Sequence, residues 1–115
     1  MKHTFNLTPF EIAVLLLCQK VGYGVIIFAL RGRTPDAAGI SVKENIDCSK
    51  KRWEPQYLGD VRSQISDEQM VAVSAMRSSS LDRELHITVN GGQPVKVEIL
   101  YTIPIAQLTI ALPKS

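Results

Sequence analysis

The first strong pattern along the chain is a helix start followed by a long apolar run. Thr8 and Glu11 have the spacing of a capping box, in which each side chain accepts a hydrogen bond from the other residue's backbone N–H. The pattern predicts a helix over residues 9–21, closed by Gly22 and apolar on nearly all sides. Such a helix is typical of a core or a subunit interface. A single apolar helix over residues 12–30 is the alternative.

The middle of the chain changes from apolar to mixed-charge sequence. The continuous, β-branched run 25–30 predicts a buried strand. Residues 31–65 carry seven Lys or Arg and five Asp or Glu, and we expect them to be loop-rich. Within them, residues 40–47 alternate between apolar and polar like a strand but also hold a helix-capping pattern. Both interpretations of this short element stay open.

The last third of the chain predicts a helix and then β-structure. Ser66 and Gln69 form a second capping box, and the helix that they start reaches about Arg77. Apolar and polar residues then alternate over 85–101 around an Asn-Gly-Gly turn, which predicts a β-hairpin. We expect residues 105–112 to add a third strand, so that the tail forms an antiparallel meander.

These elements predict an α+β fold, with two helices packed on one face of a small, mostly antiparallel sheet that ends in a three-stranded meander. With 115 residues, the chain is expected to form a single domain over 1–115, because a second domain would have almost no core. The predicted core consists of Ile12, Leu15, Leu16, Val25, Ile27, Val73, Met76, Leu85, Ile87, Val97, Ile99, Leu108 and Ile110.

Composition and charge exclude several classes of protein. Apolar residues make up 45% of the chain and charged residues 21%, which excludes a disordered or collagen-like chain. Lys20 lies within the apolar stretch 12–30, where it opposes membrane insertion, so a membrane partner is not expected. The chain has two cysteines, and we expect both to be free thiols in a cytoplasmic protein.

No set of residues along the chain has the spacing of a catalytic or metal site. Its histidines and cysteines are isolated at positions 3, 18, 48 and 86, which matches no zinc motif. A hydrolase or transferase would also need a nucleophile, a base and a group that orients the base. We therefore expect a protein that is not an enzyme and that needs no cofactor.

The sequence favours an interaction protein of the inhibitor, immunity, adaptor or regulator type. Its partner would be another protein, and homo-oligomers are possible, because the first helix carries more apolar surface than a small sheet covers. The last strand is also a candidate edge for pairing with another chain.

A nucleic-acid-binding regulator is the alternative function. Lys50, Lys51 and Arg52 precede Trp53, so cations that neutralise phosphates lie beside a ring that stacks on bases. The acidic residues of the same segment would oppose phosphate. The candidate contacts for nucleic acid or a partner are Arg31, Arg33, Lys50, Lys51, Arg52, Trp53 and Tyr57.

Overall fold

The computed structural model describes residues 2–3, 6–46, 48–49, 61 and 64–107. In chain order its elements are β1 (Lys2–His3), α1 (Pro9–Val21), β2 (Tyr23–Arg31), β3 (Thr34–Glu44), β4 (Ile65–Ser66), α2 (Asp67–Met76), β5 (Arg83–Asn90), β6 (Gln93–Tyr101) and the 3-10 helix η1 (Ile105–Gln107). Four strands form an antiparallel sheet in the order β3-β2-β5-β6, and β1 pairs with β4 separately. The order α1-β2-β3 therefore repeats as α2-β5-β6, with β2 and β5 adjacent at the centre.

Both helices begin where the capping boxes predict. In α1, Thr8 Oγ1 accepts from the backbone N–H of Glu11 at 3.2 Å, and a Glu11 carboxylate oxygen accepts from the N–H of Thr8 at 2.8 Å. Ser66 and Gln69 make the same two bonds at the start of α2. The alternative of one helix over 12–30 is wrong, because α1 ends at Gly22, whose φ of 78° suits glycine, and β2 follows at once.

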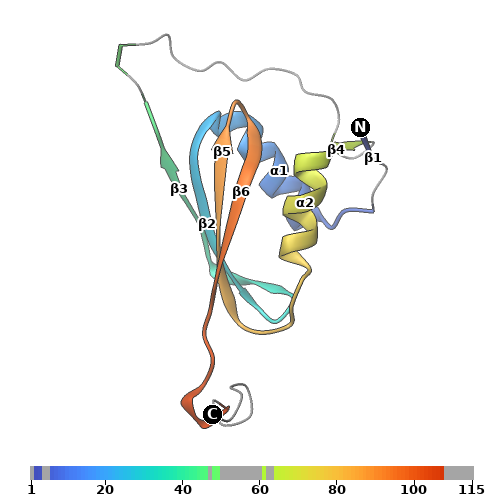
Figure 1. Cartoon of the computed structure of the whole chain (residues 1–115), viewed down its shortest axis with the longest axis vertical. Helices are drawn as coiled ribbons and strands as arrows, with labels where there is room; N and C mark the ends of the chain where they lie inside the picture. The colour runs from blue at the N-terminus through green and yellow to red at the C-terminus, as the bar shows by residue number, and fades with distance from the viewer. Residues whose placement is uncertain (1, 4–5, 47, 50–60, 62–63, 108–115) are drawn as a thin grey trace, which may run out of the picture.

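The core lies between the sheet and the two helices, which pack against the same sheet face (Figure 1). Alternate residues of β2 and β5 point into it, and Phe10 of α1 meets Phe28 of β2 edge to face, with ring centroids 5.2 Å apart. Cys18 is fully buried here, and burial raises the pKa of its thiol to about 12. This arrangement belongs to the α+β class.

Most of the predicted core residues that the structure describes are buried or partly buried. Leu15, Val73, Met76, Leu85 and Ile87 are buried, and Ile12, Val97 and Ile99 pack partly buried against them. Leu16 was expected in the core and is 37% exposed, because the buried side of α1 follows Val14, Leu15, Cys18 and Val21. Leu108 and Ile110 lie outside the described residues.

The predicted strand after α1 is confirmed, but the prediction that Val25 and Ile27 point into the protein core is wrong. Val25 and Ile27 lie on the face opposite the helices, whereas Ile26, Phe28 and Leu30 are buried beneath them. The run 25–30 is apolar at every position, so alternation could not distinguish the two faces.

The loop-rich interpretation of residues 31–65 is wrong for its first third, which forms the long strand β3. The open question over residues 40–47 resolves as a strand, since Ile40–Glu44 pairs residue by residue with β2. Between Pro35 and Ile40 the register shifts, and Asp36 accepts a hydrogen bond there from the N–H of Ala38.

The hairpin predicted over 85–101 is confirmed as β5 and β6. The prediction of a third strand over 105–112 is wrong for its first three residues, because Ile105–Gln107 forms the 3-10 helix η1 beyond the end of the sheet (Figure 1). The remainder of that predicted strand lies outside the described residues. Pro104, just before η1, has no N–H for a sheet ladder.

Neither helix among the described residues has the length and apolar character needed to cross a membrane.

Candidate functional site

An apolar groove of about 150 Å³ lies between helix α2 and strand β6. We call it the α2–β6 groove. It is lined by Glu68, Val71 and Ala72 from the helix and by Pro94, Val95, Lys96 and Val97 from the strand. Five of these seven side chains are apolar, and the two charged ones are of opposite sign.

The helix wall of the groove follows from the spacing of its residues. Val71 and Ala72 lie three and four positions after Glu68, so all three share one face of α2. Ala72 is buried and closes the floor, whereas Val71 is 65% exposed. A β-branched apolar side chain so exposed on a helix has no role in the core.

The strand wall is shaped by a bulge. Lys96 pairs with Thr88 and Pro94 pairs with Val89, which leaves Val95 as the extra residue of β6. Its side chain is 54% exposed and lies at the groove. Pro94 is compatible with this position because a strand at the edge of a sheet tolerates a missing N–H.

Hydrogen bonds hold the helix wall in place at both ends. At the N-terminal end of α2, Ser66 Oγ donates to Gln93 Oε1, the side chain of the first residue of β6, at 3.2 Å. At the C-terminal end, Arg83 Nη2 donates to the carbonyl oxygen of Met76 at 2.6 Å. The groove is therefore formed before any ligand arrives, which lowers the ordering cost of binding.

Beside the groove, β6 presents an open strand edge. The sheet order puts β6 at one end, and among the residues that the structure describes no strand lies on its outer side. Its backbone groups on that side are free to pair with an added strand. Tyr101 at the end of β6 is 41% exposed, so apolar surface continues along the same edge.

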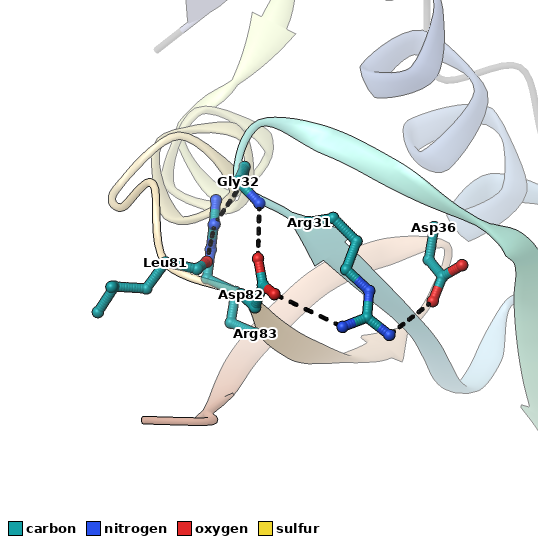
Figure 2. Close-up of polar contacts among 6 residues, drawn as sticks. All are labelled: Arg31, Gly32, Asp36, Leu81, Asp82 and Arg83. Carbon is teal, nitrogen blue, oxygen red and sulfur yellow. Dashed lines mark hydrogen bonds and ion pairs between the residues drawn. The ribbon is translucent and has the colours of Figure 1, made fainter. Parts of the chain in front are cut away.

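Arg31 and Arg33, two of the residues predicted to bind nucleic acid or a partner, lie at the turn between β2 and β3. Figure 2 shows Arg31 between two carboxylates, with N–O distances of 3.4 Å to Asp36 and 3.5 Å to Asp82. Asp82 also accepts from the backbone N–H of Gly32 at 3.1 Å. The positive charge of Arg31 is thus offset within the fold.

Of the other predicted contacts, the structure describes only Arg33. Lys50, Lys51, Arg52, Trp53 and Tyr57 lie outside the described residues, so the expected cluster stays a prediction. Arg33 is exposed at the same turn as Arg31.

Sequence reasoning missed a buried arginine at the start of β5. Arg83 is 3% exposed and donates to the carbonyl oxygens of Gly32, Leu81 and Met76 at 2.6–2.8 Å. Figure 2 shows it reaching from β5 to the β2–β3 turn. The signal was present, because Arg83 shares its alternation with the buried Leu85.

Sequence reasoning also missed an ion pair between the helices. Arg77 donates two hydrogen bonds of 2.6 Å to the carboxylate of Glu11, whose side chain is buried. Burial by itself raises the pKa of Glu11, but the hydrogen bonds from Arg77 and Thr8 outweigh it. The pKa of Glu11 therefore lies below its ordinary value of 4.5.

The remaining titratable groups are dispersed. His86 Nε2 lies 2.6 Å from a Glu84 carboxylate oxygen on the face opposite the helices, and Cys48 is exposed. Within the described part of the chain, no three His, Cys, Asp or Glu side chains are grouped so that they could hold a metal ion.

Comparison with known proteins adds no relative. The chain matches no protein family model, no curated protein and no solved structure. The functional conclusion therefore depends on the site itself.

Proposed function

We propose that this protein is an interaction module that binds an extended polypeptide strand along the free edge of β6, beside α2. The observation that carries the proposal is the apolar α2–β6 groove next to an unpaired strand edge. Strand addition needs both parts. Backbone hydrogen bonds supply affinity, and pockets for alternate side chains supply specificity.

The chemistry of the groove defines the ligand. A strand added to β6 points every second side chain toward the helix layer. Val71 and Val95 would flank one such side chain, so a β-branched or small aliphatic residue fits best. Glu68 on the helix wall is the charged side chain at the groove, which favours a polar or basic residue beside the apolar anchor.

Other observations agree with a protein partner more than with a nucleic acid. The carboxylates of Asp36 and Asp82 offset Arg31, a candidate phosphate contact at the end of β2. A separate part of the proposal is the location of the protein. Both Cys18 and Cys48 are free thiols, which agrees with the cytoplasmic location that we expect. The module would act by binding and would carry out no chemistry of its own.

Selection from a phage-displayed library of random peptides tests this proposal. We expect the enriched peptides to share an apolar residue at alternate positions. In an NMR titration they should shift the backbone amide signals of 67–76 and 93–101. Val71→Lys should weaken their binding about tenfold or more, because it places a charge in the apolar groove.

Val42→Lys is the matched control. Val42 is also an exposed valine, at 43%, but it lies on β3 at the opposite edge of the sheet. Its substitution should leave peptide affinity unchanged. Enrichment of no peptide, or equal binding by Val71→Lys and the original chain, would reject strand addition at β6.

A further inference from the structure

We infer that the strand received by β6 is β6 of a second copy of this chain, paired antiparallel around a two-fold axis at Val97. This inference rests on the proposed function, because it names the partner of the same site. It arises from the sequence of the edge itself, Val95-Lys96-Val97-Glu98-Ile99. That segment is complementary to its own reversed copy.

The charges are complementary in this register. When Val97 lies opposite itself, Lys96 lies opposite Glu98 of the second copy, and Glu98 lies opposite Lys96 of the second copy. Both side chains are 64% exposed, and within one chain Lys96 Nζ lies 3.5 Å from Glu98 Oε1, so the second copy would extend this ion pair into a cluster of four alternating charges. They lie on the face opposite the helices, because their partners on β5, Thr88 and His86, alternate with buried residues. Opposite charges in directly opposed positions stabilise a strand pair.

The apolar side chains are complementary on the helix side. In the same register, Ile99 and Tyr101 of the second copy come to lie beside Val95 and Gln93. There they would cover the α2–β6 groove and the exposed Val71 on its helix wall. Each copy supplies both groove and occupant, as an isologous two-fold interface requires. The groove is thus complete only when a second copy is present.

The other edge of the sheet lacks this complementarity. On β3, antiparallel pairing around Val42 would place Lys43 opposite Ser41 and Glu44 opposite Ile40. In that register no pair of opposite charges forms, and Lys43 would lie opposite Glu44 only with the two-fold axis between these last two residues of β3. The observations therefore assign self-pairing to β6.

A charge-swap experiment tests the register. Lys96→Glu places two acidic residues opposite two acidic residues, and Glu98→Lys places two basic residues opposite two basic residues. By sedimentation velocity at low salt, we expect the original chain to be a dimer and each variant to dimerise about tenfold more weakly or worse. An equimolar mixture of the two variants should form a one-to-one heterodimer. The double variant Lys96→Glu with Glu98→Lys should dimerise again by itself.

Lys43→Glu on β3 serves as the control, since it changes the same charge on the opposite edge and should leave the dimer intact. Failure of the mixture and of the double variant to restore dimers would reject this register. A chain that stays monomeric at about 100 µM while library peptides bind β6 would reject self-pairing and leave the proposed function standing. A monomer that binds no peptide would reject both.

Discussion

Glu11 joins the two helices through a charge that is almost completely removed from solvent. Its carboxylate accepts from Thr8 at the start of α1 and twice from Arg77 at the end of α2. A buried carboxylate is costly when unpaired, so its partners are part of the fold. The sequence predicts that Glu11 closes the capping box of α1. The sequence pattern does not reveal that Glu11 also anchors α2 through Arg77.

Glu11→Gln should lower the free energy of unfolding by about 1–2 kcal/mol near neutral pH. The loss is smaller than for a fully buried ion pair, because the Arg77 side chain is 39% exposed and solvent screens its charge. Because the pKa of Glu11 is lowered in the folded state, its contribution is complete above 4.5 and is lost as pH falls through the folded-state pKa. The difference between the two chains should therefore shrink as pH falls further and further below 4.5. Urea unfolding across this range measures it.

Glu44→Gln is the control, because Glu44 is an exposed carboxylate on β3. It should change stability by less than about 0.5 kcal/mol. A difference between the original chain and Glu11→Gln that grew at low pH would contradict the assigned pKa direction.

The elements differ in how much of their structure the sequence reveals. Capping boxes act within four residues, so the starts of both helices could be predicted to the residue. The face of β2 could not be, because residues 25–30 are all apolar and only the packed helices select Ile26 over Ile27. The α2–β6 groove could not be predicted either, because its two walls are distant along the chain and meet only through tertiary packing.

The first half of β3, residues 34–39, was missed because proline, aspartate, alanine and glycine there have low strand propensity. The pairing of β3 with β2 depends instead on close approach. The backbone carbonyl of Lys43 lies where a Cβ on Gly24 would be, so only glycine lets the two strands meet there.

Gly24→Ala should therefore destabilise the fold by about 1–3 kcal/mol, because the clash is with backbone that cannot rotate away. The effect should be local. Amide hydrogen exchange should accelerate along β3 more than along β5 and β6. Ser41→Ala, an exposed change on β3, should leave exchange as it was, and uniform acceleration across the sheet would contradict the local role of Gly24.

At the scale of the whole molecule, Arg83 adds side-chain hydrogen bonds at the end of the sheet where β5 already pairs with β2. Its guanidinium joins the β2–β3 turn, the C-terminal end of α2 and the loop before β5 (Figure 2). These bonds reinforce the β2–β5 pairing that joins the first helix-strand-strand unit to the second. The same contact holds the helix wall of the α2–β6 groove.

Arg83→Met should cost about 2–4 kcal/mol, because three carbonyl oxygens lose their donor in a buried site. Arg31→Met is the matched control in the same cluster. The Arg31 side chain is 66% exposed, so its ion pairs should contribute less than about 0.5 kcal/mol. Thermal unfolding compares the two. Equal losses of stability in the two variants would mean that burial does not determine how much each arginine contributes to stability.

The burial of Cys18 gives the protein an internal reporter of its own opening. Its thiol has no exposure in the closed fold and is almost never a thiolate at neutral pH, whereas Cys48 is exposed. A thiol reagent should therefore modify Cys48 at once and reach Cys18 only in molecules whose core has opened. In a Cys48→Ser chain, the rate of modification would follow how often α1 separates from the sheet, molecule by molecule and without denaturant.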